Sequence, residues 1–482
     1  MKLSNIVRGR GELAGKSLPA GETVRRALSA LRKLSPPLGV ALKRIDACDV
    51  LRLPVYKCEI TVKAKDGFAE GEFFKHISYG KGRNAELSKA SALMEFVERF
   101  SCQAFLDNKS NYRAGFQGGE DHKRAVRIIP FSWQERYRKD RFICGELRKL
   151  PVKLYCSFSL TENKPFLFPL DWFTSTTNGF ASGNCLEEAV LQGLCEVIER
   201  HNIADIVGNR IITPLVDVVS VKNNAARDII SRFVKSGLRL FIRDFSHKIG
   251  VPTVGVLVYD RASRGAARFN AAAGASASRD IALLRALSEL AQNRSQGLSR
   301  QTCLYRSCGF SFYCSFLEAE YLCKKTKPVP FSSLPDHADG NFRSEIMTAV
   351  KKLEYHGLPV IVTEVTHPVL RIPSVIVTVP GALHRHCGFT DPYFKLQKDC
   401  LLSRQEPKAG LILRKFLRVY GLQGIKREYL LNLAGQYEKT GHSRLAEDIY
   451  EAALGAFADD KDTVFNLKCY RGLARAHLNG EQ

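Results

Sequence analysis

The sequence predicts an α+β protein with mixed and antiparallel sheets, followed by an all-α segment toward the C-terminus. Short runs of β-branched residues occur as far as residue 381 in no regular alternation with helices, which argues against a repeating βαβ unit. Three long stretches carry apolar residues at helical spacing, and strand signals stop near residue 400. With 482 residues and 45% hydrophobic content, the chain is long enough to bury more than one core.

Five segments are expected to form strands, because each is short and rich in valine, isoleucine or threonine. They are residues 57–63, 239–245, 253–260, 359–365 and 374–381. Three helices are expected over residues 84–103, 186–204 and 280–296, and each is introduced by a glycine, serine or asparagine. Together these elements form the predicted α+β body.

The C-terminal segment reads as a helix, a glycine-containing turn and a second helix over residues 428–460. Six residues fall at the spacing of a tetratricopeptide unit, namely Leu433, Tyr437, Gly441, Ala446, Tyr450 and Ala453. The usual glycine and proline of that unit are replaced by Ala434 and Ala458. One repeat cannot bury its apolar face alone, so we expect this tetratricopeptide-like tail to pack on the main body or on a partner.

Composition restricts the partners and the compartment. The formal net charge of +23, from 72 Lys and Arg against 49 Asp and Glu, favours polyanionic partners without choosing among them. The 14 cysteines include no C-x-x-C pair, so neither a zinc ribbon nor a thioredoxin-type motif is supported. Since no apolar run approaches the roughly 18 residues of a membrane span, we expect a cytoplasmic protein.

Each of the three long helices places polar residues on one face. The stripes are Ser91, Glu95 and Glu98 in the first helix, Glu188, Gln192, Glu196 and Glu199 in the second, and Arg285, Glu289 and Gln292 in the third. Carboxylates gathered beside apolar residues repel one another unless a cation lies among them, and Mg²⁺ prefers oxygen ligands. The arginines Arg99, Arg200, Arg285 and Arg294 could bind phosphates or neutralise the glutamates. A solvated helix face gives the same pattern, so both interpretations stay open.

Glycine-containing segments precede the first two helices. Gly80, Lys81 and Gly82 lead into one, and residues 178–184 lead into the other. Glycines at a helix entrance allow backbone N–H groups to approach an anion, although ordinary helix-starting turns also contain them. A P-loop is not supported, because G-x-x-x-x-G-K-[ST] ending at Ser17 requires glycine where the chain has Arg10.

In this order, the motifs resemble the signature of the YcaO superfamily. They are GKG (80–82), SALMEFVER (91–99), NGFASGN (178–184), EAVLQGLCEVIER (188–200) and ALLRALSELAQNR (282–294). The resemblance covers roughly residues 20–395, and it implies a YcaO-type fold. We expect residues 1–60 to be the N-terminal part of the domain, 61–395 its ATP-binding catalytic core and 396–482 the helical tail.

The resemblance implies a site for ATP and Mg²⁺ that lacks a P-loop. Carried over by position, the magnesium ligands are Glu95, Glu98, Glu188, Glu196 and Glu199. The nucleotide contacts are Lys81, Ser91, Asn184, Arg200, Arg285, Glu289 and Gln292. The implied chemistry is ATP-dependent activation of a peptide-backbone amide, giving an azoline with a side-chain nucleophile or a thioamide with sulfide. The residues do not nominate a covalent catalytic nucleophile.

Two departures from the azoline-forming members shape the expected partners. The chain ends in RAHLNGEQ where many of those members have a proline-rich tail, and this favours either thioamide formation or a less-characterised role over ring formation. Too few residues precede residue 20 for a peptide-delivering domain, so we expect a peptide or protein substrate brought by a separate, TfuA-like partner, and a homodimer. The alternative is a non-catalytic ATP-binding or basic helical-repeat scaffold. Nucleic acid is not expected, because aromatic and basic residues do not interleave as in single-strand binders.

Overall fold

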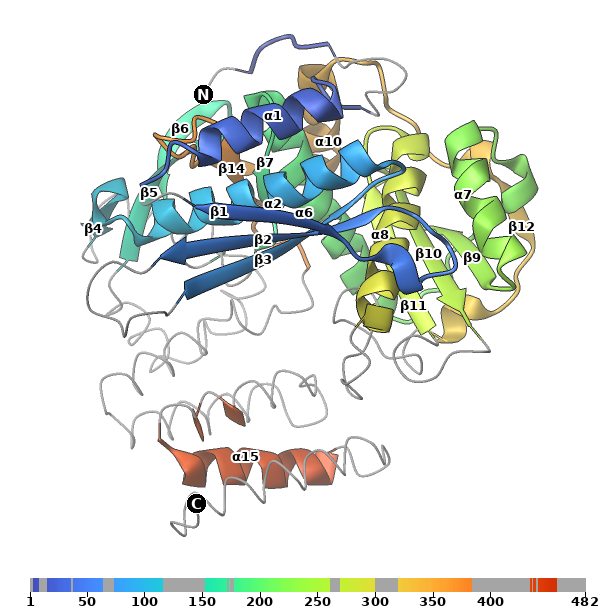
Figure 1. The fold of residues 1–482 in the computed structure, drawn as a ribbon. Coiled ribbons are helices and arrows are strands. Elements are labelled where there is room, and N and C mark those ends of the chain that lie inside the picture. Colours follow the sequence, from blue (N-terminus) through green and yellow to red (C-terminus); the bar gives the residue numbers. More distant parts are fainter. Residues whose placement is uncertain are drawn as a thin grey trace. The chain divides into compact units, whose positions relative to one another are not determined.

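The computed structural model describes residues 3–7, 15–35, 38–63, 73–115, 152–170, 173, 177–260, 269–299, 320–383, 434–435, 437–438 and 441–456. The chain divides into two compact units. The first consists of residues 1–113, 155–168 and 177–384, and the second of residues 114–154, 169–176 and 385–482. Three sheets and six of the described α-helices lie wholly or mostly in the first unit (Figure 1).

The first sheet is antiparallel and consists of β1 (Gly39–Arg44), β2 (Val55–Lys63) and β3 (Phe73–Lys81). Helix α2 (Ala85–Asp107) packs on this sheet, and α1 (Ala20–Leu31) packs on α2 (Figure 1). Gly80 makes the close approach of β3 and α2 possible, because a Cβ there would collide with the Ser88 carbonyl and the Ala92 nitrogen. The short contact fixes the start of α2 against the end of β3.

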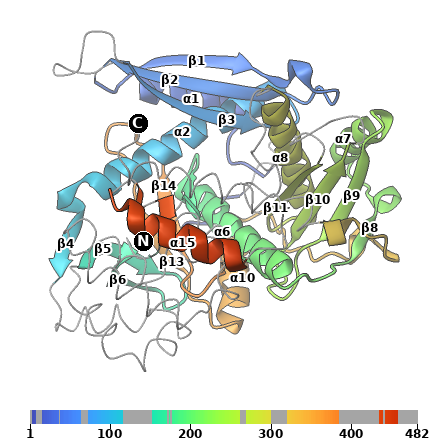
Figure 2. The same cartoon turned by 90° about the horizontal axis from the view of Figure 1, so that it is seen from below.

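The second sheet has the order β4-β5-β13-β14-β7, with β6 paired to β5. Its strands are β4 (Tyr112–Gly115), β5 (Val152–Ser159), β6 (Lys164–Phe168), β7 (Phe180–Ser182), β13 (Ile361–Glu364) and β14 (Ser374–Thr378). Helix α6 (Leu186–Gly208) packs on β14 and β7, and α10 (Phe342–Tyr355) packs on α6 (Figure 2). Gly179 has φ +80°, and its carbonyl accepts from Val377 N at 2.8 Å, which joins the chain before β7 to β14.

The third sheet has the order β11-β10-β9-β8-β12, and β12 is parallel to β8. Its strands are β8 (Leu215–Asp217), β9 (Arg239–Asp244), β10 (Thr253–Tyr259), β11 (Phe269–Ala275) and β12 (Pro328–Pro330). Helix α8 (Arg279–Ser299) packs on β10 and β11, and α7 (Asn224–Lys235) packs on α8 and β9. With α2 and α6, α8 completes the set of three helices that carry the polar stripes.

The expected strands correspond to β2, β9, β10, β13 and β14, and the expected helices to α2, α6 and α8, so these predictions and the α+β class are confirmed. The expected helix boundaries agree with the observed ones to within a few residues. Strand β11 was not predicted, because its sequence FNAAAGA lacks β-branched residues. Its small side chains are required by α8, since a Cβ on Gly274 would meet Ala282 O and Ala286 N.

The second unit contains α15 (Ser443–Ala456), preceded by a turn at Gly441 with φ +81° and by helical residues at 434–435 and 437–438. Tyr437 is buried, and Tyr450 Oη donates to Glu438 at 3.1 Å. The tetratricopeptide character of the tail stays a prediction, because most of residues 385–482 lie outside the described part of the chain. Among the described residues, no helix is long and apolar enough to cross a membrane.

Candidate functional site

The stripe-bearing helices begin at well-defined caps. Asn84 Oδ1 accepts from Leu87 N at 2.9 Å at the start of α2, and Cys185 Sγ accepts from Glu188 N at 3.4 Å at the start of α6. Capping satisfies N–H groups that a helix otherwise leaves without partners. The glycines at these entrances permit close packing, since a Cβ on Gly82 would meet Leu87 of α2 and a Cβ on Gly183 would meet Ala189 of α6.

Five carboxylates from three helices interact electrostatically and form what we call the carboxylate cluster: Glu95 and Glu98 from α2, Glu196 and Glu199 from α6, and Glu289 from α8. Basic side chains lie among them. Arg99 lies 3.4 Å from Glu95 and 3.5 Å from Glu98, and Arg200 lies 3.8 Å from Glu196. Lys81, at the end of β3, binds Glu289 at 2.5 Å and so joins the first sheet to α8.

Burial and mutual repulsion disfavour the charged form of most of these glutamates. The pKa of Glu98 is raised well above its ordinary value, first by burial and then by the charge of Glu196. Burial and the charge of Glu289 raise the pKa of Glu199 to about 7, against the opposing effect of Arg200. The pKa of Glu289 is lowered, because Lys81 and the nearby arginines outweigh the effect of burial. A cation placed among these groups would favour their charged forms.

The carboxylates of the cluster are the ligand type that a divalent cation prefers, but their side chains are not grouped around one point. Within the described ranges, no three His, Cys, Asp or Glu side chains are grouped closely enough to hold a metal ion. The glutamates contact arginine and lysine instead, so cation binding requires them to exchange partners. Gln292, one turn beyond Glu289 on α8, has a buried Oε1 with no hydrogen-bond partner among the described residues. An amide oxygen is a ligand type that Mg²⁺ accepts, which agrees with this stripe facing a bound group.

Glu188 lies in a second group of residues, near the start of α6. Its carboxylate accepts from Ser17 N at 2.9 Å and from Ser17 Oγ at 2.7 Å, and Lys16 Nζ lies 3.3 Å away. Asn184 Nδ2 lies 3.4 Å from both of its oxygens. These contacts lower the pKa of Glu188 despite burial. Eight residues separate Glu188 from Glu196, so the two are about 12 Å apart along the helix axis.

This second group contains residues that the sequence analysis did not select. Lys16 and Ser17 end the segment that was rejected as a P-loop. The Gly-Lys-Ser sequence of that segment is the signal from which they could have been selected. Thr23 Oγ1 donates to Asn184 Oδ1 at 3.1 Å, and Arg26 donates to Asn184 O at 2.7 Å. The structure therefore divides the predicted ligands of ATP and Mg²⁺ between two places along α6.

The remaining predicted residues lie at or near the carboxylate cluster, with one exception. Ser91 stands one turn before Glu95 on α2, and the charge of Arg285 acts on Glu196, Glu199 and Glu289. Arg294, a candidate phosphate contact, is 2% exposed and lies 3.4 Å from Asp49 and 3.3 Å from Asp260. It is therefore a buried structural residue that joins α8 to the loop before β2.

Comparison with known proteins identifies the family of this chain. Residues 79–383 match the family model described as "YcaO cyclodehydratase, ATP- and Mg²⁺-binding". The match places the domain in an ATP- and Mg²⁺-binding class. The match covers more than half of the chain, and the chain belongs to the YcaO family. The resemblance inferred from the motifs and the expected cofactors, ATP and Mg²⁺, are confirmed.

Two relatives in sequence are similar to this chain. An uncharacterized protein of Methanothermobacter thermautotrophicus is 27% identical over 353 residues, covering 70% of this chain and 88% of the relative. An uncharacterized protein in the tfuA 3′ region of Rhizobium leguminosarum bv. trifolii is 26% identical over 227 residues, covering 43% of this chain and 53% of the relative. Neither relative has an activity in its description.

Two solved structures share the fold. A heterocyclase in complex with substrate and cofactor has a TM-score of 0.62 at 22% identity, and the match covers 80% of this chain but 54% of the heterocyclase. YcaO from Methanopyrus kandleri bound with AMPPCP and Mg²⁺ has a TM-score of 0.57 at 20% identity, covering 80% of this chain and 96% of that protein. At these identities the comparisons establish the fold alone.

Proposed function

We propose that this protein uses ATP and Mg²⁺ to activate a peptide-backbone amide for nucleophilic substitution, as a post-translational modification of a peptide or protein. The observation that carries the proposal is the convergence of five carboxylates from α2, α6 and α8 with Arg99, Arg200, Arg285 and Lys81 around them. Phosphoryl transfer depends mainly on positioning and charge neutralisation, and this set of side chains supplies both.

Each part of the cluster has a task in this reaction. Glu95, Glu98, Glu196 and Glu199 are proposed to hold Mg²⁺, with Glu289 released from Lys81 when the ion binds. Lys81 and the arginines are then available to the phosphate oxygens of ATP. When bound, ATP supplies the phosphoryl group that accepts the amide oxygen and leaves with it as inorganic phosphate. Glu188 is a weaker candidate for a metal ligand, because Lys16 and Ser17 already neutralise and bind its carboxylate.

We propose thioamide formation as the outcome, with a TfuA-like protein as the sulfur-delivering partner. In this reaction sulfide adds to the amide carbon, the oxygen is phosphorylated, and phosphate departs so that sulfur replaces oxygen. The relative found in a tfuA 3′ region supports this choice over ring formation. An azoline would instead require an adjacent Cys, Ser or Thr side chain as the nucleophile.

Substitution of the cluster tests the activity. Glu95→Gln and Glu199→Gln should each abolish ATP hydrolysis, while Asp228→Asn on the exposed face of α7 should leave it unchanged. Unchanged turnover in both cluster variants would overturn the proposal. If ATP stabilises the protein against heat but is not hydrolysed with any peptide, sulfide or partner, the ATP-binding scaffold is the better function.

Mass spectrometry of the proteome, with and without the gene, identifies the product. A thioamide adds about 16 mass units, because sulfur replaces oxygen, whereas an azoline loses about 18 as water leaves. A modified peptide that gains about 16 only when the protein is present would support thioamide formation. A loss of about 18 would support ring formation and reject our choice between the two.

A further inference from the structure

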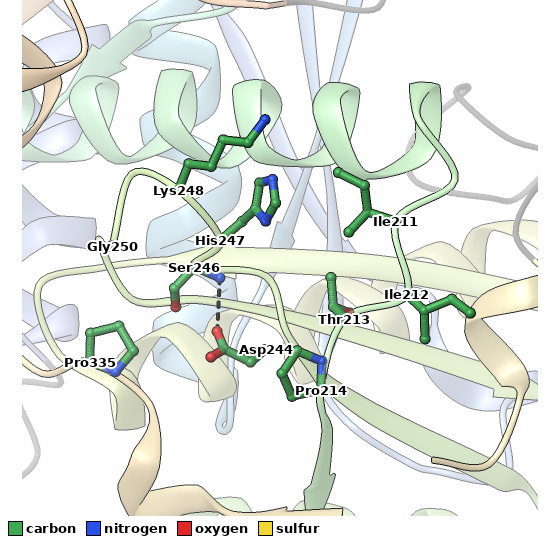
Figure 3. A pocket seen from close by; sticks show the side chains of 10 residues that line it. All are labelled: Ile211, Ile212, Thr213, Pro214, Asp244, Ser246, His247, Lys248, Gly250 and Pro335. Carbon is green, nitrogen blue, oxygen red and sulfur yellow. Dashed lines mark hydrogen bonds between the residues drawn. The ribbon is translucent and has the colours of Figure 1, made fainter. Parts of the chain in front are cut away.

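A hollow of about 530 Å³ lies beyond the C-terminal end of α6, and its lining contains no residue of the carboxylate cluster (Figure 3). Four apolar side chains contribute to its lining, namely Ile211, Ile212, Pro214 and Pro335. Asp244, the last residue of β9, lies among them, with Ser246, His247 and Lys248 in the following loop (Figure 3). Ile212 is 54% exposed, so the apolar surface continues to the outside of the protein.

Hydrogen bonds to backbone carbonyl groups hold the walls of the hollow in place. Arg243 is fully buried, and it donates Nε to Leu322 O at 2.5 Å and its other nitrogens to Thr213 O and Lys324 O. On the opposite side, Gly250 N donates to Ser246 O at 3.0 Å. Because these walls are already in place, a ligand that enters the hollow does not have to order the surrounding chain.

The charges around the hollow leave Asp244 without an ionic partner. Its Oδ1 accepts from Ser246 N at 2.8 Å, and it forms no ion pair with any residue in the described part of the chain. Two basic residues that line the hollow, His247 and Lys248, both contact Asp205 on α6, at 3.0 and 3.2 Å. A third, Lys352, approaches the hollow at Gly250 rather than at Asp244. The ammonium of Lys248 points away from Asp244 (Figure 3).

Two further titratable groups on the chain beside Pro335 are also engaged. Asp336 lies 3.5 Å from Arg279, and His337 Nε2 lies 2.8 Å from Gly250 O. Among the described residues that line the hollow, Asp244 is the only carboxylate. The hollow therefore combines an uncompensated carboxylate with apolar walls, which complements a long side chain that ends in a positive charge.

We propose that this hollow binds an arginine or lysine side chain of a peptide, with the charged end on Asp244 and the methylene groups against the two prolines and Ile212. Such a site would hold a basic residue of the substrate or partner at a distance from the reacting amide. The binding itself does not depend on amide activation, so its test is separate from the test of the proposed function.

Fluorescence anisotropy of short labelled peptides on the full-length protein tests the site. The peptides carry arginine, lysine or citrulline between glycines, and citrulline keeps the shape of arginine without its charge. We expect the arginine or the lysine peptide to bind at least about tenfold more tightly than the citrulline peptide, since a hydrogen bond to a charged group contributes about 1.5–3 kcal/mol. Equal affinity of all three peptides would overturn the proposal.

Two variants locate the binding. Asp244→Asn keeps the oxygen that accepts from Ser246 N but removes the charge, so it should abolish the preference for the cationic peptides. Ile212→Lys adds a cation at the exposed rim and should weaken only the cationic peptides. Val234→Lys, at a position on α7 that is 63% exposed, is its control and should leave all affinities unchanged. A preference that survives both Asp244→Asn and Ile212→Lys would place the binding elsewhere and reject the site.

Discussion

Two glutamates of α6 should respond to neutralisation in opposite directions, although they lie in the same helix. Burial and the charge of Glu289 raise the pKa of Glu199 to about 7, whereas Lys16 and Ser17 lower the pKa of Glu188. In protein free of nucleotide and metal, Glu199→Gln should therefore stabilise the fold at pH 8. Glu188→Gln should destabilise it at the same pH.

The magnitude for Glu199 follows from linkage. Its pKa rises from an ordinary value of 4.5 to about 7 in the folded protein, and each pKa unit corresponds to about 1.4 kcal/mol. The folded state is therefore penalised by roughly 3 kcal/mol above pH 7. The penalty grows as the pH rises from 4.5 to 7, because the unfolded chain ionises this group while the folded chain holds it protonated. Near pH 4 the penalty is absent.

The opposite sign applies to Glu188. A lowered pKa stabilises the folded state at a pH above the ordinary value of 4.5, and that contribution is lost as the pH falls through the folded-state pKa. The stability of each variant relative to the natural protein is measured by denaturant unfolding at pH 5 and pH 8 in EDTA. If both variants shift stability in the same direction at pH 8, or if the Glu199→Gln effect is the same at both pH values, the electrostatic reasoning is refuted.

Three further outcomes are expected from packing and burial. Gly80→Ala should destabilise the protein by several kcal/mol, because α2 blocks the added methyl group, while Gly21→Ala in α1 should be neutral or stabilising in the same thermal unfolding assay. Arg243→Met should also cost several kcal/mol, since it strips a buried donor from each of three carbonyl groups, and denaturant unfolding would show this. Cys58, with a pKa of about 11, should resist iodoacetamide at pH 8 under conditions that alkylate the exposed Cys156, as peptide mapping would show.

Periodicity predicted the elements of the fold that have strong patterns of their own. Helices α2, α6 and α8 were predicted because their apolar and polar residues recur at helical spacing, and β10 because it is a short run rich in valine. Strands such as β11 could not be predicted, because the close approach of α8 determines its composition. The composition of β11 thus depends on its packing against α8, a long-range contact that local sequence does not reveal.

Local sequence also predicted only part of the candidate site. Helical spacing places Glu95 with Glu98, and Glu196 with Glu199, but only the tertiary structure brings the two pairs together and adds Glu289. Spacing also placed Glu188 on the same helix face, although its partners are Lys16 and Ser17, far away in the sequence. Arg294 looked equivalent to Arg200 by motif, yet it is buried between two aspartates. Long-range contacts decide which members of a motif share a site.

The bond between Lys81 and Glu289 has a consequence for the order in which ligands arrive. The cluster is close to charge balance without any ligand, because Arg99, Arg200, Arg285 and Lys81 lie among its five carboxylates. Mg²⁺ held by these glutamates would displace the basic side chains, and the phosphates of ATP would then supply their negative partner. The metal and the nucleotide should therefore bind cooperatively, and neither should bind tightly alone. We therefore expect Lys81 to stay on Glu289 until both the metal and the nucleotide bind.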